Sequence, residues 1–155
     1  LYKCFLPQAW QFNNQNGVTA FIHPDGVYDD SQGGNLRQYL YAKLRRHFQF
    51  QNEMKLFAED AHRAIYALNI YCNNATTEFD SISNLFDPLT IDQCYENEHK
   101  GKVGGIKDNN DNWNINGHPD RIIRINKDAL TLFAQLIDGT DKWQQARLPF
   151  IGSIN

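Results

Sequence analysis

The spacing of hydrophobic residues predicts a helix at the start of the chain and a strand after it. Residues 1–12 carry apolar side chains at intervals of three or four, which is typical of one face of a helix. These residues are Leu1, Phe5, Ala9 and Phe12, with Leu6 and Trp10 beside them. The polar segment 13–17, which ends in glycine, should stop this helix. Residues 18–22 are apolar at consecutive rather than alternate positions, which predicts a strand covered on both faces, as in a parallel sheet.

A second helix and a hairpin are predicted next. Leucines at every fourth position from 36 to 44 form one stripe of a helix over residues 35–47. Residues 48–51 alternate between apolar and polar, and residues 64–71 have an apolar centre, so both read as strands. The short polar segment before residue 64 leaves no room for a crossover helix, so we expect an antiparallel hairpin. The order helix, strand, helix, hairpin indicates an α/β fold.

The second half of the chain is more irregular in sequence. Two further strands are predicted at residues 101–106 and 121–125, joined by a turn rich in Asn and Asp. A helix should then run over residues 127–137, with Asn126 as its N-cap and Gly139 as its stop.

Two regions follow from this pattern. We predict that residues 1–73 form the end of an α/β domain and that residues 74–155 form a small α+β extension with one antiparallel strand pair and one helix.

Composition narrows the class of protein. The chain has 155 residues, of which 41% are hydrophobic, and a formal net charge of -3, which fits a folded domain without a strongly basic surface. No apolar run approaches the roughly 20 residues of a membrane span, so we expect no membrane partner. Three widely spaced cysteines favour reduced thiols in the cytoplasm, and the five histidines lack zinc-ligand spacing. Because the chain starts at Leu1 rather than Met, we expect it to be an internal piece of a longer protein.

One window of the sequence is basic. Residues 31–52 contain no Asp or Glu. The basic residues of this window are Arg37, Lys43, Arg45 and Arg46. On the predicted second helix, Arg37, Tyr41 and Arg45 recur every four residues, so they could bind phosphates together with an aromatic ring. A solvent-exposed helix face is the other interpretation.

A metal-dependent nuclease is an alternative. Pro24-Asp25 followed by Glu53 and Lys55 matches the pattern of nucleases in which two carboxylates hold Mg²⁺ and a lysine orients the attacking water. The pattern is short, and Asp25 precedes Gly26 in a predicted turn. The cluster Asp108–Asn112 fails the spacing of a calcium loop, so we expect a solvated turn there.

Several strings resemble large bacterial adenine-specific DNA methyltransferases of restriction–modification and phage-defence systems. In the first half these strings are Phe21–Asp30 (FIHPDGVYDD), Leu36-Arg37, His47–Glu53 (HFQFQNE), Leu56-Phe57 and Asn69–Tyr71. In the second half they are Ile82–Phe86, Thr90–Asp92, Gly105–Asp108, Trp113-Asn114, Gly117-His118 and Arg121–Ile123. The resemblance covers nearly the whole chain.

The resemblance implies a place in the parent fold. The family's catalytic domain is a doubly wound sheet that ends in an antiparallel hairpin, and residues 1–73 would be its last third. The parent would bind S-adenosylmethionine and methylate the exocyclic amine of a flipped adenine. The chain itself lacks the family's F-x-G-x-G and [DNS]-P-P-[FYW] motifs; Asp87-Pro88-Leu89 is the nearest approach to the second. We therefore expect no cofactor and no catalytic residue in this piece.

The resemblance also implies how the piece meets its partners, which are DNA and the remaining domains of the same polypeptide. Ligands gather at the carboxyl ends of strands in a doubly wound sheet. The residues that would therefore line the cleft for the target base are five that follow the strand at 18–22. They are His23, Pro24, Asp25, Gly26 and Tyr28. For one of them, Asp25, the alternative interpretation is that it only forms a turn. The four basic residues would contact DNA phosphates or another domain. A non-catalytic DNA-binding or interaction module remains a further alternative.

Overall fold

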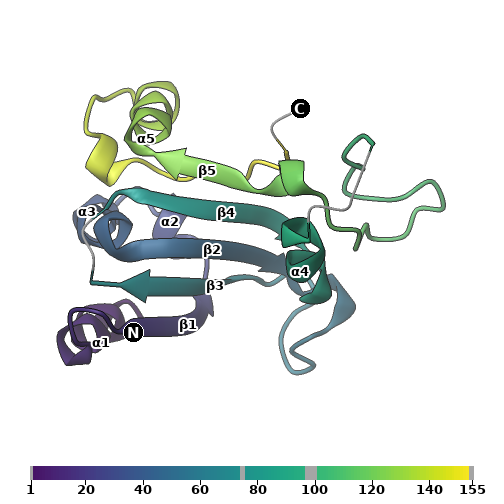
Figure 1. Cartoon of the computed structure of the whole chain (residues 1–155), viewed down its shortest axis with the longest axis horizontal. Coiled ribbons are helices and arrows are strands. Elements are labelled where there is room, and N and C mark those ends of the chain that lie inside the picture. Colours follow the sequence, from purple (N-terminus) through teal and green to yellow (C-terminus); the bar gives the residue numbers. More distant parts are fainter. Residues whose placement is uncertain (1, 74–75, 97–100, 154–155) are drawn as a thin grey trace.

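The computed structural model describes residues 2–73, 76–96 and 101–153, and its centre is a mixed sheet of five strands in the order β1-β3-β2-β4-β5 (Figure 1). The strands are β1 (Val18–Pro24), β2 (Leu44–Gln51), β3 (Ile65–Cys72), β4 (Glu78–Leu85) and β5 (Ile123–Asn126). The α-helices are α1 (Phe5–Phe12), α2 (Gly26–Asp29), α3 (Gly34–Lys43), α4 (Leu89–Tyr95) and α5 (Lys127–Phe133). Short helical turns are η1 (Tyr2–Cys4), η2 (Asn52–Met54), η3 (Pro119–Arg121), η4 (Ala134–Asp138, a π-helix) and η5 (Trp143–Gln145). The chain is thus α/β.

The strand directions confirm the predicted hairpin. β3 is antiparallel to both β1 and β2, so β1 and β2 run the same way, and β4 is parallel to β2. β5 closes the sheet antiparallel to β4. The chain passes from β1 to β2 through α2 and α3, which makes a crossover between parallel strands.

The first strand does not have the predicted environment. β1 lies at an edge of the sheet, paired only with β3, and its alternate residues Val18, Ala20 and Ile22 are exposed. The prediction of a strand covered on both faces was therefore wrong. The first helix forms, but its buried residues are Leu6 and Trp10, whereas Phe5 and Phe12 are exposed.

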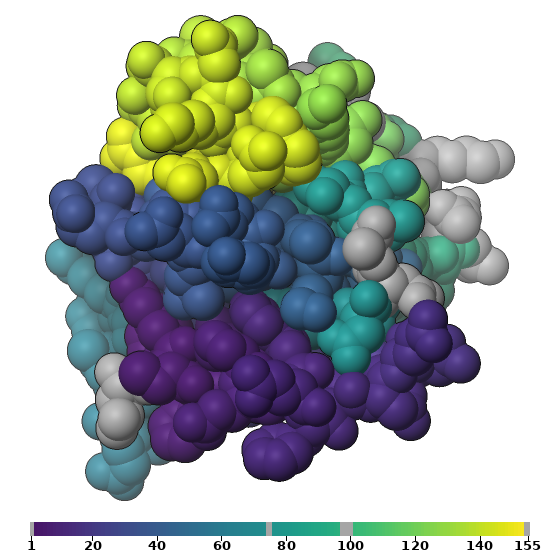
Figure 2. Space-filling view, turned by 90° about the vertical axis from the view of Figure 1, so that its left-hand side faces the viewer, coloured from purple at the N-terminus to yellow at the C-terminus, as the bar shows by residue number. Residues whose placement is uncertain are grey.

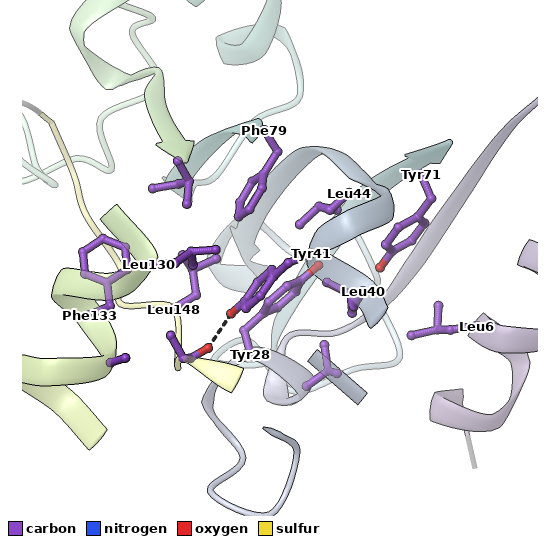
Figure 3. Close-up of a cluster of buried hydrophobic side chains, with 14 of the residues drawn as sticks. Leu6, Tyr28, Leu40, Tyr41, Leu44, Tyr71, Phe79, Leu130, Phe133 and Leu148 are labelled. Carbon is purple, nitrogen blue, oxygen red and sulfur yellow. Dashed lines mark hydrogen bonds between the residues drawn. The ribbon is translucent and has the colours of Figure 1, made fainter. Parts of the chain in front are cut away.

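The main core covers one face of the sheet. Helices α1, α2, α3 and α5 contribute buried side chains such as Leu6, Tyr28, Leu40 and Leu130, drawn in Figure 3. The Tyr41 hydroxyl donates to the Ala146 carbonyl at 2.7 Å, which fixes the C-terminal segment to α3. Figure 2 shows this segment (yellow) lying along the blue region of α3. A smaller cluster on the other face comprises Phe48, Phe50, Ile82, Leu85 and Cys94.

The second predicted helix ends earlier than expected. α3 stops at Lys43, and Leu44 is already extended, with φ -67° and ψ 135°. Arg45 and Arg46 therefore lie on β2, where the register against β3 shifts between Leu44 and Arg46. Leu44 is buried, but it reaches the core from the strand. The predicted basic helix face containing Arg45 does not exist.

The second half adds a strand that the sequence pattern did not indicate. β4 lies between β2 and β5, in a region interpreted as irregular. Residues 101–106 are not a strand, so the antiparallel pair of this half is β4 with β5. Strands from both sides of the predicted boundary at residue 73 therefore share one sheet.

The predicted signals around the last helix and the Asn/Asp turn are confirmed. The Asn126 side chain accepts from the Ala129 amide at 3.0 Å, and Gly139 adopts φ 63° after η4. Asp108 and Asn112 close an exposed turn through the Asp108 amide and the Asn112 carbonyl at 2.8 Å. Within the described residues, no helix has the length and apolarity to cross a membrane.

Candidate functional site

The carboxyl ends of three parallel strands lie along one edge of the sheet. β1 ends at Pro24, β2 at Gln51 and β4 at Leu85, and the loop after β2 and helix α4 lie at this edge, on the right in Figure 1. Open α/β sheets bind ligands at such an edge. A ligand site is therefore expected at this edge.

A pocket of about 430 Å³ opens beside the end of β1, and we call it the β1-end pocket. Its walls include His23 and Pro24 from β1, Tyr66 from β3 and Phe57 from the loop after β2. Asn52, which is fully buried, holds that loop, because its side chain donates to the Phe57 carbonyl at 2.8 Å and accepts from the Phe57 amide at 3.0 Å. This volume falls within the range of roughly 300–1,000 Å³ of small-molecule sites.

Tyr66 supplies an aromatic ring to this pocket. Its ring stacks on Phe50 with the centroids 5.5 Å apart, and Phe57 meets it edge-on at 4.9 Å. Its buried hydroxyl has no hydrogen-bond partner among the described residues, and burial raises the pKa of that hydroxyl. The pocket thus offers flat aromatic walls, while the Tyr66 hydroxyl itself is buried behind them.

His23 connects the pocket to a buried polar network. Its Nε2 lies 3.1 Å from the Tyr71 hydroxyl, and its Nδ1 lies 2.8 Å from the Pro24 carbonyl. Since that carbonyl only accepts, Nδ1 carries the proton and the Tyr71 hydroxyl donates to Nε2. Burial lowers the pKa of His23, which favours the neutral ring. The Tyr28 hydroxyl donates to Oδ1 of Asn69 beside it.

Asp25, His47 and Ser81 form a second part of the network. Nε2 of His47 lies 2.9 Å from Oδ1 of Asp25, and Nδ1 lies 2.9 Å from Oγ of Ser81. These residue types occur together in serine hydrolases, but the exposed fractions of the three residues are only 1–5%. A nucleophile must reach its substrate, so this chain of bonds serves to join the end of β1 to β2 and β4.

The five predicted base-cleft residues therefore lie in three different places. His23 and Pro24 line the β1-end pocket. Asp25 and Tyr28 are buried in the polar network, and Gly26 is exposed at the start of α2.

Arg37 is not available to DNA. It is 2% exposed, and its guanidinium donates to the carbonyls of Val27 at 3.0 Å, Asp30 at 2.6 Å and Gln145 at 3.0 Å. Arg37 therefore joins the α2 region and α3 to the C-terminal segment.

The other three basic residues of the predicted face each contact a different group within the chain. Lys43 donates to Oδ1 of Asn73 at 3.0 Å, and Arg45 donates to the Thr76 carbonyl at 2.9 Å. Arg46 pairs with the buried Asp80 at 3.2 Å. The structure does not bring the four predicted phosphate contacts together on one face.

The nuclease residues have unrelated partners. Asp25 is bound to His47, whereas Glu53 in η2 lies 3.1 Å from Nδ1 of the exposed His62. Lys55 follows in the left-handed region with φ 53° and forms no ion pair with either carboxylate in the described part of the chain. Across residues 2–73, 76–96 and 101–153, no three His, Cys, Asp or Glu side chains cluster as a metal site requires.

Several residues of the site were not predicted as site residues from the sequence. Phe57 and Tyr66 of the pocket have no local signature. Asn69 does: it is a polar residue inside the apolar run 64–71, and such residues often take part in buried hydrogen bonds. Ser81 lies in β4, which was not predicted.

Comparison with known proteins adds no identification. No family model matches the sequence, and no curated protein matches it.

Proposed function

We propose that this chain is part of a large bacterial adenine-specific DNA methyltransferase, of the cytoplasmic restriction–modification or phage-defence type. In this proposal it supplies the last strands of the catalytic sheet and part of the DNA cleft, and it is inactive alone. The sequence resemblance motivates the proposal. The crossover from β1 to β2, with the antiparallel strand β3 between them, supports it because the resemblance implies a sheet that ends in a hairpin.

The open edge of β1 is the observation that carries the proposal. The Asp25 amide donates to the Ile65 carbonyl, so these two residues form a hydrogen-bonded pair of the antiparallel ladder. Because hydrogen-bonded and non-hydrogen-bonded pairs alternate along such a ladder, the backbone N–H and C=O groups of Ala20 and Ile22 point away from β3. β1 contains no charged residue, and the side chains of Val18 and Ile22 are 66% and 57% exposed. Monomeric proteins usually protect such an edge with charges, proline or a covering element, and in β1 only the last residue, Pro24, is of this kind. A neighbouring strand from the rest of the parent would satisfy this edge.

In this proposal the chain does not itself bind S-adenosylmethionine. Among the described residues, Gly33 and Gly34 are the one pair of adjacent glycines that precedes a helix, where a ligand could be held. A Cβ on Gly33 would lie 2.8 Å from Nη1 of Arg37. That glycine is needed for internal packing. In our proposal, cofactor binding and methyl transfer therefore belong to other parts of the parent.

The β1-end pocket is the proposed contribution of this chain to the DNA cleft. Aromatic side chains stack on unpaired bases at roughly 1–3 kcal/mol per base. Phe57 is 40% exposed and stands at the pocket beside His23 and Pro24, so it can cover a base that has left the helix. Neither the nuclease alternative nor a free-standing DNA-binding surface has a comparable observation in its favour.

The full open reading frame that contains this sequence tests the proposal. We expect F-x-G-x-G and [DNS]-P-P-[FYW] upstream of the segment FIHPDGVYDD. A reading frame without both motifs would contradict the proposal.

A further inference from the structure

Arg121 is a buried cation without a counter-ion in the described part of the chain. It is 6% exposed, and its guanidinium donates only to backbone carbonyls: Asn116 at 2.8 Å, Ser83 at 3.2 Å and Asn84 at 3.1 Å. Burial lowers the pKa of Arg121, and no described carboxylate offsets this effect. Buried charges are normally paired, because an isolated charge in a protein interior is costly.

A second pocket, of about 200 Å³, has Arg121 in its lining, and we call it the Arg121 pocket. Ser83 and Asn84 from the end of β4 line it, together with the backbone of Gly104, Gly105 and Gly152. The volume is below the roughly 300–1,000 Å³ of sites for drug-sized ligands, so it suits one small group. Glycine allows a ligand to approach the backbone closely.

Asn84 is held in an unusual conformation at this pocket. Its φ is 57°, in the left-handed region that non-glycine residues rarely adopt. The Asn84 amide donates to Oε1 of Gln49 at 2.8 Å, and its Oδ1 accepts from Nε2 of Gln51 at 3.0 Å. Nδ2 of Asn84 makes no hydrogen bond within the described residues and is therefore a free donor at the pocket.

We propose that the Arg121 pocket binds a phosphate group. Arginine recognises phosphate through charge-assisted hydrogen bonds, and its Nε–H makes no bond to any described residue. The pocket lies at the carboxyl end of β4, on the same sheet edge as the β1-end pocket and three strands away, which is about 14 Å at the usual strand spacing. The site takes either a free phosphate or a phosphate of a DNA backbone that crosses this edge.

Isothermal titration of the folded 155-residue chain with inorganic phosphate tests the proposal. We expect one saturable site. Arg121→Lys keeps the charge but loses the planar fork, so it should weaken binding at least about tenfold. Gly152→Glu should abolish binding, because the residue lines the pocket, a Cβ there meets nothing closer than 4.0 Å, and the carboxylate can occupy the phosphate position.

Arg124→Gln is the matched control. Arg124 pairs with Glu78 at 2.6 Å and with Asp80 at 2.7 Å on the exposed side of β5, so its loss should leave phosphate affinity unchanged. If Arg121→Lys does not fold, Gly152→Glu still decides the matter. Absence of saturable binding by the folded wild-type chain, or equal affinity in wild type and Gly152→Glu, would overturn the proposal.

Competition with a duplex oligonucleotide distinguishes the two sources. Displacement of phosphate by DNA assigns the pocket to a DNA backbone, and phosphate binding that DNA does not affect assigns it to a free phosphate. Both results keep the phosphate site. The titration requires no methyl transfer, so its outcome is independent of the test of the proposed function.

Discussion

His47 donates through Nε2 to Oδ1 of Asp25 over 2.9 Å, and both residues lie in the protein interior, with exposed fractions of 1% and 3%. Because a carboxylate only accepts, this bond places the proton on Nε2, and the Ser81 hydroxyl can then donate to Nδ1. One histidine thus connects the turn after β1 with β2 and β4.

The first prediction concerns this bond. Asp25→Ala should lower the free energy of unfolding by about 3 kcal/mol, because it leaves a buried imidazole N–H without its acceptor. Asp29→Ala is the control, since that side chain is 76% exposed and its nearest cation, Arg147, is 3.9 Å away. The control should change stability by less than about 0.5 kcal/mol in urea denaturation. Equal stability of the two variants would show that the network is not structural.

His23 should make stability depend on pH. Its pKa in the folded protein is lowered from 6.5 by burial, so the unfolded chain binds more protons at mildly acidic pH. Its contribution is therefore fully present above about pH 6.5 and is lost as the pH falls below that value. Urea denaturation between pH 7.5 and 5 should show a smaller loss for His23→Gln than for wild type.

His62→Gln serves as the control for this measurement, because the His62 side chain is 54% exposed. This variant should keep the pH dependence of the wild-type chain. If His62→Gln flattens the curve and His23→Gln does not, the assignment to His23 is wrong.

Arg37 and Lys43 both belonged to the predicted basic face, yet they should behave differently on substitution. Arg37→Met removes the guanidinium from the carbonyls of Val27, Asp30 and Gln145, of which Asp30 still accepts from the Gly33 amide, so it should cost about 3 kcal/mol of stability. Lys43→Met removes one hydrogen bond to Asn73 and should cost less than about 1 kcal/mol. Thermal unfolding of both variants measures the difference, and similar melting temperatures would argue against the buried role of Arg37.

Gly117 lies where no side chain fits. A Cβ there would lie 2.7 Å from the Cys94 amide nitrogen, which belongs to the backbone of α4 and cannot move aside easily. Gly117→Ala should therefore destabilise the protein by about 1–3 kcal/mol. Gly105→Ala, whose Cβ meets nothing closer than 3.6 Å, should be neutral or slightly stabilising, and urea denaturation of the pair checks both expectations.

The sequence predicted those helix ends that are determined by residues close to them along the chain. Asn126 and Gly139 act on the backbone within a few residues, so their roles as cap and stop could be recognised. The end of α3 could not, because Leu44 continues the leucine stripe and only the pairing of β2 with β3 shows that it belongs to a strand.

Strand β4 and the candidate site depend on distant partners. Asp80 and Ser81 look like loop residues in the sequence, yet they are buried because Arg46, His47 and Arg124 meet them from other strands. The β1-end pocket was predicted only as far as His23 and Pro24, since Phe57 reaches it through a loop held by Asn52. Such long-range pairings have no local sequence signal.

Transfer of labelled methyl groups from S-adenosylmethionine to duplex DNA tests the central claim most directly. Our proposal predicts that a longer protein containing this sequence labels adenine, and that the 155-residue chain, whose sequence has no F-x-G-x-G and no [DNS]-P-P-[FYW], gives no incorporation above background. In the longer protein, Phe57→Ala should lower kcat/KM about tenfold through lost stacking, whereas Leu136→Ala, 75% exposed in η4, should not. Methylation by the 155-residue chain alone, or a longer protein that never labels adenine, would contradict the account.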